Sequence, residues 1–389
     1  MEKKNLLLFI GCFLLTSCST PRPPSITMQV NTQAELNASP ATTSTVSPTL
    51  PLASTIAPSE TPTVSPTPLP YGGGKGILLV SKNNELILYD SNQGTSKPLM
   101  DSVQEYAWSP DGSQIAALTK GGSLPEGVYI INLSDQSHKL IDGRSNIFRI
   151  KWSPDGSILA YLVPDRKSYL FQMDITLYML DGSSPLALHT ISDYTGYSND
   201  FSIDIAVFDY AFTQDQSNVY FSAIYGGSHT SYLYRIRGTQ WYKFPVRVLP
   251  NNFQGSLDNL KWSPDGKKMA LVNCDEGNIY LYDPIKSVLQ KVTNFSSNTG
   301  STLCIMTVEW MKDGQGIVFS RGSIYSINTD GSSQKQLTNP GWTFSPSISP
   351  DGKMIAYSDG QDVYGMKIDG TNTFKLTAGE SVAWQPGMK

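Results

Sequence analysis

Five aspartates occupy the same place in a recurring motif, and by residue type alone they could form a catalytic or calcium-binding array. The motif Trp-Ser-Pro-Asp-Gly starts at Trp108, Trp152 and Trp262, and four weaker copies start at Phe212, Trp310, Ile348 and Trp384. The aspartates are Asp111, Asp155, Asp265, Asp313 and Asp351. Pro presets the first corner of a turn, and Asp-Gly supplies a residue that tolerates positive φ. We therefore expect these aspartates to stabilise separate hairpin turns rather than to meet in one site.

Other residue patterns that carry chemistry are weak in this chain. The three histidines, His138, His189 and His229, do not stand at metal-ligand spacing from one another or from cysteine. The sequence has no Gly-x-Ser-x-Gly, phosphate-loop or dinucleotide glycine pattern. The net charge of −4 argues against a nucleic-acid partner. We expect no metal site, no cofactor and no bound nucleic acid.

One irregular stretch carries aromatic and polar side chains that suit ligand binding. These candidate residues are Tyr169, Tyr194, Tyr197, Asp200, Tyr225, His229 and Tyr232. They stand in the longest repeat units, which places them in loops, and loops on a rigid scaffold commonly carry binding sites. Aromatic rings interleaved with Asn, Asp and His can hold a sugar ring or a peptide. The alternative is that the rings only pack the long loops onto the scaffold.

The elements that must position these residues are short strands. Each of the first six motifs is followed by an apolar run, such as 115–118 or 355–357, then by a second run and a polar turn. Such runs, bounded by Asp, Gly, Pro and Ser, are typical of strands, about four to a unit. One small sheet cannot bury its faces alone, whereas radial stacking of several sheets buries them, as in a β-propeller. The repeat tryptophans expected to pack between neighbouring sheets are Trp108, Trp152, Trp262, Trp310 and Trp384.

The two ends of the repeat region complement each other. The motif at Trp384 has no strands after it, whereas 76–81, 85–90 and 97–100 read as three strands with no motif before them. Pairing the C-terminal strand with these N-terminal strands completes one sheet and closes the ring. The sequence thus predicts an all-β, seven-bladed β-propeller over residues 71–389. Six blades are the alternative, if the unit at Phe212 belongs to its neighbour.

The recurring motif and the strand after it resemble the WD40-like (PD40) repeats of TolB-type propellers. In those repeats Trp-Ser-Pro-Asp-Gly precedes a strand similar to Ile355-Ala356-Tyr357-Ser358. The resemblance covers residues 71–389. TolB carries a separate α/β domain ahead of its propeller, whereas this chain has low-complexity sequence there. The resemblance therefore does not imply a role in the Tol–Pal envelope system.

The first 70 residues predict an export signal and a tether. Two lysines precede the apolar run 6–15, which is too short to span a bilayer. Leu15-Thr16-Ser17-Cys18 resembles the bacterial lipobox, which implies removal of residues 1–17 and lipidation of Cys18. The alternative is an ordinary secretory signal with a chance cysteine. Residues 18–70 are rich in Pro, Ser and Thr, a composition typical of a disordered tether. We expect an extracytoplasmic protein that contacts a bacterial membrane only through its lipid.

Two cysteines remain within the propeller region. Cys274 ends the second strand of one unit, and Cys304 begins the innermost strand of the next. Propeller topology places both on the same face, so a cross-blade disulfide suits an oxidising compartment. Two buried free thiols are the alternative.

These observations favour a binding function over an enzymatic one. We expect a monomeric, non-enzymatic scaffold whose ligand is a glycan, a peptide or another envelope protein. The alternative is a propeller hydrolase or lyase that uses carboxylates at the channel mouth, such as Asp200, Asp275 or Glu276. Such carboxylates act as acid and base only if their surroundings separate their pKa values.

Overall fold

The computed structural model of the chain contains strands and no helix in the residues that it describes. These residues are 76–164, 173–180, 186–188, 205–225, 231–237, 246–249, 253, 255–295, 304–339 and 341–387. All of them belong to the larger of the two units into which the chain divides, Ser65–Lys389. Within these ranges, accordingly, no helix is long and apolar enough to cross a membrane.

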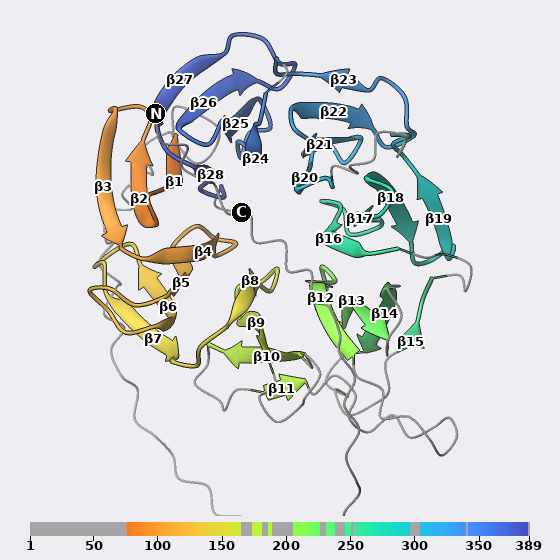
Figure 1. Cartoon of the computed structure of the whole chain (residues 1–389), viewed down its shortest axis with the longest axis horizontal. Coiled ribbons are helices and arrows are strands. Elements are labelled where there is room, and N and C mark those ends of the chain that lie inside the picture. The colour runs from red at the N-terminus through yellow and green to blue at the C-terminus, as the bar shows by residue number, and fades with distance from the viewer. Residues whose placement is uncertain are drawn as a thin grey trace, which may run out of the picture. The chain divides into compact units, whose positions relative to one another are not determined.

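The described strands form seven four-stranded antiparallel sheets around a common axis (Figure 1). Sheet A comprises β28 (Ser381–Trp384), β1 (Ile77–Lys82), β2 (Glu85–Asp90) and β3 (Thr95–Met100). Sheet B comprises β4 (Val103–Trp108), β5 (Gln114–Thr119), β6 (Gly127–Asn132) and β7 (His138–Asp142). Sheet C comprises β8 (Phe148–Trp152), β9 (Ile158–Pro164), β10 (Met173–Met179) and β11 (Leu186–Leu188). Sheet D comprises β12 (Ile205–Phe212), β13 (Asn218–Tyr225), β14 (Ser231–Arg237) and β15 (Val246–Arg247). Sheet E comprises β16 (Leu257–Trp262), β17 (Met269–Asn273), β18 (Asn278–Asp283) and β19 (Val288–Lys291). Sheet F comprises β20 (Thr307–Trp310), β21 (Gly316–Ser320), β22 (Ile324–Asn328) and β23 (Lys335–Gln336). Sheet G comprises β24 (Phe344–Ile348), β25 (Met354–Ser358), β26 (Asp362–Lys367) and β27 (Phe374–Ala378). The first-named strand of each sheet lies nearest the axis (Figure 1).

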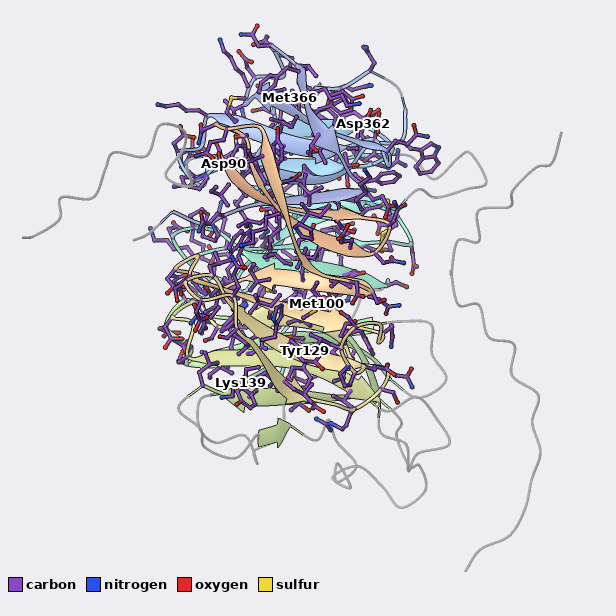
Figure 2. The ribbon with its side chains drawn as sticks, turned by 90° about the vertical axis from the view of Figure 1, so that its left-hand side faces the viewer. Asp90, Met100, Tyr129, Lys139, Asp362 and Met366 are labelled. Atoms are coloured by element: carbon purple, nitrogen blue, oxygen red, sulfur yellow. A yellow bond between two sulfur atoms is a disulfide. The ribbon has the colours of Figure 1, made fainter. Side chains whose placement is uncertain are left out.

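The first and last strands of the ring belong to one sheet. β1 pairs antiparallel with β28, so that Leu78 stands opposite Trp384 and Val80 opposite Val382. This confirms the predicted pairing of the C-terminal strand with the N-terminal strands. The unit at Phe212 forms a sheet of its own, sheet D. Figure 2 shows the molecule from the side of the closing region, with Asp90 of sheet A and Met366 of sheet G labelled.

Serine and aspartate brace the turn after the inner strand in sheets B, C, E and G. In sheet C, Ser153 Oγ donates to Asp155 at 2.7 Å and accepts the Ile158 N–H at 2.9 Å. Asp155 also accepts the Ser157 N–H at 2.9 Å, and Gly156 takes the positive φ of 78° that the turn requires. Ser109, Ser263 and Ser349 make the same pair of bonds in their own sheets. The repeat aspartates are turn formers, as predicted.

The repeat tryptophans join neighbouring sheets. Trp152 Nε1 donates to the carbonyl of Ala107 in sheet B at 3.1 Å. Trp108 and Trp310 donate in the same way to the sheet before their own, at 3.2 and 3.0 Å. The ring of Trp152 packs on a buried cluster that combines Leu118 of sheet B with Leu159 of sheet C, among others. The core is therefore a series of clusters between sheets, as the predicted packing role of these tryptophans requires.

A disulfide adds a covalent link between two sheets. Cys274, in the turn after β17, is bonded to Cys304, which stands just before β20, with the Cα atoms 4.7 Å apart. Of the two alternatives that the sequence leaves open, the structure contains the disulfide. The bond ties sheet E to the entry of sheet F.

Candidate binding site in the axial cavity

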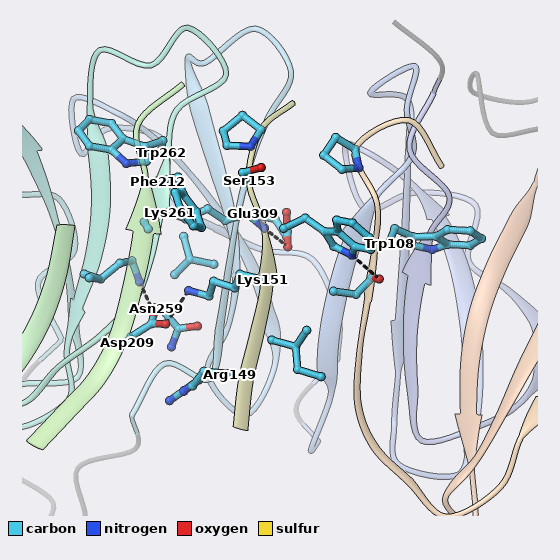
Figure 3. A pocket seen from close by; sticks show the side chains of 18 of the residues that line it. Trp108, Arg149, Lys151, Ser153, Asp209, Phe212, Asn259, Lys261, Trp262 and Glu309 are labelled. Carbon is cyan, nitrogen blue, oxygen red and sulfur yellow. Dashed lines mark hydrogen bonds and ion pairs between the residues drawn. The ribbon is translucent and has the colours of Figure 1, made fainter. Parts of the chain in front are cut away.

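A cavity of about 480 Å³ lies among the inner strands of sheets B to F (Figure 3). Repeat residues form much of its wall, including Trp108, Trp152 and Trp262. Its charged lining residues are Arg149, Lys151, Asp209, Lys261 and Glu309. Each of them stands one or three residues before the first residue of its repeat motif. Side chains at both positions line the cavity.

Bulges in the inner strands determine the direction of the backbone N–H groups beside the cavity. The β8–β9 pairing skips from Phe148 to Lys151, and Arg149, inside the skip, has a φ of 58°. The N–H groups of Arg149 and Ile150 consequently leave their own sheet and donate to the Glu105 carboxylate of sheet B, at 2.7 and 2.8 Å. A bulge is a common way to re-aim a strand next to a site. Here it lets the acid of one sheet bind the backbone of the next.

Sheet E repeats this arrangement one step further around the ring. The β16–β17 pairing is interrupted between Asp258 and Lys261, and Asn259 has a φ of 54°. The N–H of Leu260 donates to Asp209 of sheet D at 2.8 Å. Asp209 thus acts on sheet E as Glu105 acts on sheet C.

Ion pairs then connect the inner strands across the cavity. Lys151 Nζ of sheet C lies 2.5 Å from Asp209 Oδ1 of sheet D, and it also donates to the Tyr210 carbonyl at 2.7 Å. The Arg149 guanidinium reaches past sheet D to Asp258 of sheet E at 2.8 Å. Lys261 of sheet E pairs with Glu309 of sheet F. Four consecutive sheets are held by these three pairs.

The members of this network differ in their access to solvent. The Asp209 side chain is 1% exposed, whereas Lys261 and Glu309 are 44% and 25% exposed. Asp209 is therefore committed to holding sheets C, D and E together. The Lys261–Glu309 pair presents a donor and an acceptor to the cavity, which suits a ligand with both kinds of group, such as a peptide.

Burial shifts the ionisation of the acids behind the cavity. It raises the pKa of Glu105, and the N–H bonds from Arg149 and Ile150 oppose that rise only in part. Burial likewise raises the pKa of Asp258, against the lowering effect of Arg149. For Arg149, desolvation is outweighed by the carboxylates of Asp258, Asp209 and Glu105, so its pKa is raised. The guanidinium thus stays charged while the two acids hold their protons to a higher pH.

Most of the predicted ligand-binding residues lie outside the described part of the chain. These are Tyr169, Tyr194, Tyr197, Asp200 and His229, and the same holds for Cys18. Tyr225 and Tyr232 were expected in loops, but they lie in β13, opposite Ile205, and in β14, opposite Ala223. The expectation was wrong for these two because the β-branched and aromatic run through Tyr225 keeps its pairing to the end of β13.

Two carboxylates of the enzymatic alternative, Asp275 and Glu276, make local contacts, and the third, Asp200, lies outside the described residues. Glu276 accepts hydrogen bonds from Lys291 and from the Tyr280 hydroxyl, both at 2.7 Å. Asp275 accepts the Ser256 N–H at 3.1 Å. Neither lines the axial cavity. In the described ranges, no three His, Cys, Asp or Glu side chains gather closely enough to hold a metal ion.

The axial residues were missed at the sequence level although a signal was present. The residue just before the first residue of the motif is charged in sheets C, E and F, where it is Lys151, Lys261 and Glu309. In the other sheets this residue is Ala or Ser. Comparing the repeats at this variable position would have singled out these three residues.

Comparisons with known proteins give the fold alone. No family model matches the chain, and no curated protein matches it. Among solved structures, the chain is similar to a functionally unknown protein from Desulfotomaculum acetoxidans DSM 771, with 10% identity, 80% of this chain and 99% of that one covered, and a TM-score of 0.54. It is also similar to the β-propeller domain of Myceliophteria thermophila Cps50 (Swd1), with 12% identity, coverage of 73% and 91%, and a TM-score of 0.50. A match to TolB from Acinetobacter baumannii has 16% identity, coverage of 79% and 81%, and a TM-score of 0.46.

The match to a solved β-propeller domain agrees with the ring of sheets described above. At these identities a shared fold carries no shared function, because propellers serve many unrelated tasks. The function has to be argued from this chain's own cavity.

Proposed function

We propose that this chain is a bacterial lipoprotein whose seven-bladed, TolB-like propeller binds a peptide segment of another envelope protein. The lipobox-like sequence ending at Cys18 supports the lipid anchor, and the composition of 18–70 supports a tether between anchor and propeller. The seven four-stranded sheets support the blade number. In this proposal the propeller acts as a monomer, without cofactor and without nucleic acid.

The axial cavity is the observation that carries the proposal. It combines apolar walls with the exposed Lys261–Glu309 pair, and a volume of about 480 Å³ falls in the range of ligand sites. A peptide segment offers a carbonyl to the lysine and an N–H to the glutamate. We assign no catalytic step to the cavity, because its charged side chains are engaged with one another.

A crosslinking experiment in cells tests this function. Partners captured by the wild-type chain are compared with those captured by Lys261→Ala/Glu309→Ala. The control is Lys375→Ala/Asp362→Ala, which removes an ion pair of 2.7 Å on the outer strands of sheet G, away from the axis. We expect the cavity variant to capture at least about tenfold less of the partner, because both side chains that would contact the peptide are removed together.

The control variant is expected to capture the partner at the wild-type level. Equal capture by the wild type and both variants would show that the cavity is not the binding site. Equal loss in both variants, with normal amounts of folded protein, would contradict the proposal as well.

A further inference from the structure

A second pocket, of about 540 Å³, lies where the ring closes, between sheets G and A. It is lined by Ser91, Asn92, Met354, Lys367, Asn372, Phe374, Leu376 and Trp384. Four of these residues are apolar, one is a lysine and none is acidic. Phe374 is one of the few large hydrophobic side chains exposed at the surface, at 47%. The pocket is separate from the axial cavity and shares no lining residue with it.

The pocket stands at the one sheet boundary that lacks a turn contact among the described residues. Elsewhere, the turn after each inner strand packs on the corresponding turn of the sheet before it. Gly156 lies against Pro110, Gly314 against Pro264 and Gly352 against Lys312. The inner strand of sheet A is β28 and its next strand is β1, so no hairpin turn joins these two strands.

Trp384 is the one lining residue that comes from the strand that closes the ring. Its side chain is 8% exposed, and its indole Nε1 is buried without an acceptor. The same group of Trp108, Trp152 and Trp310 donates to a carbonyl of the preceding sheet. The Trp384 N–H, like that of Trp262, is enclosed by the protein, so Trp384 meets the pocket with the other atoms of its side chain.

We propose that this pocket binds a small molecule with a flat apolar body and an anionic oxygen acceptor. The body would cover Met354, Phe374 and Leu376, and the oxygen would lie at the ammonium group of Lys367. Lys367 and the amides of Asn92 and Asn372 stand among the lining residues without a carboxylate, which favours an anionic oxygen over a cationic group. The volume is that of a small-ligand site.

Titration with 2-naphthoate tests the site, because this probe is a flat ring system that carries a carboxylate. The full chain with Cys18→Ser is used, so that no attached lipid competes for the pocket. We expect one saturable site by calorimetry. Leu376→Trp fills the pocket without altering an inner strand, and we expect it to weaken binding by about tenfold or more.

Two further measurements separate this pocket from general apolar binding. Trp342→Ala removes a 59% exposed tryptophan that does not line the pocket, and it should leave the affinity unchanged. In ¹H–¹⁵N spectra, 2-naphthoate should move the indole N–H resonance that is missing from Trp384→Phe.

The absence of saturable binding, or equal affinity in Leu376→Trp and wild type, would overturn the pocket as a site. Binding with an unmoved Trp384 resonance would overturn the placement of the probe in this pocket. If Trp384→Phe does not fold, Leu376→Trp and Trp342→Ala still decide between the outcomes.

Discussion

Three residues of the Trp-Ser-Pro-Asp-Gly motif have separate structural tasks at the end of an inner strand. In sheet C, Trp152 reaches back to the carbonyl of Ala107, while Ser153 and Asp155 fix the turn ahead. Burial by itself would raise the pKa of Asp155, but hydrogen bonds from Gln216, Ser157 and Ser153 together outweigh it and lower the pKa, so this carboxylate stays ionised well into acid. Because the task of each position is structural, the motif can recur without forming a site.

Substitution of two matched tryptophans tests the hydrogen bond between sheets. Trp152 donates to Ala107, whereas Trp262 is equally half-buried but its Nε1 has no acceptor in the described residues. Both Trp152→Phe and Trp262→Phe lose ring volume, but only the first loses a hydrogen bond. We expect Trp152→Phe to lower the free energy of unfolding by about 1 kcal/mol more than Trp262→Phe, measured by urea denaturation. Equal losses would show that the indole N–H contributes nothing.

At the scale of strands, the inner strands both line the cavity and join the sheets. Glu105 and Asp209 each bind the bulged backbone of a neighbouring sheet, and Lys151 adds an ion pair to Asp209. These residues hold the sheets together, whereas Lys261 and Glu309 are more exposed than Asp209 and can contact a ligand. The position that a strand gives a side chain thus decides whether that side chain acts in the scaffold or in binding.

Removal of the disulfide tests the covalent link between sheets E and F. The cysteines are 30 residues apart, and closing a loop of this length stabilises a protein by about 3–4 kcal/mol in the chain-entropy model. We expect Cys274→Ser/Cys304→Ser to lower the free energy of unfolding by this amount. The wild type in reductant should behave like the double variant. A wild type that reductant leaves unchanged would contradict the bond.

Sequence reasoning reached the strands and turns more readily than the side chains that line the cavity. The turn role of Asp155 follows from recurrence, and so does the pairing of the two chain ends. Recurrence explains only what the repeats share, however, whereas Lys151, Lys261 and Glu309 occupy a position where the repeats differ. The pocket at Trp384 depends on which strands are not joined by a hairpin, and that is visible only once the ring is assembled.

For the whole molecule, stability depends on the strand that completes sheet A. Deleting 381–389 removes β28, exposes the edge of β1 and takes the buried Val382 and Trp384 from the core. We expect the free energy of unfolding to fall by at least about 3–5 kcal/mol, with a broadened thermal transition in calorimetry.

A shorter deletion is the matched control for this truncation. Removing residues 388–389 leaves β28 intact and should preserve the wild-type transition. If the longer deletion unfolds like the control, the closing pair does not stabilise the ring.

The closing pair also determines how the propeller responds to mechanical force. β1 is held on both sides, with six residues paired to β2 and four to β28. A pull on the chain ahead of Gly76, directed along β1, strains both hydrogen-bond ladders in shear, so many bonds must fail at once. A pull on an outer strand such as β3, held on one side only, would peel its bonds off one after another. If the N-terminal segment anchors the protein, as we propose, drag on the anchor reaches the propeller through a strand that is paired on both sides.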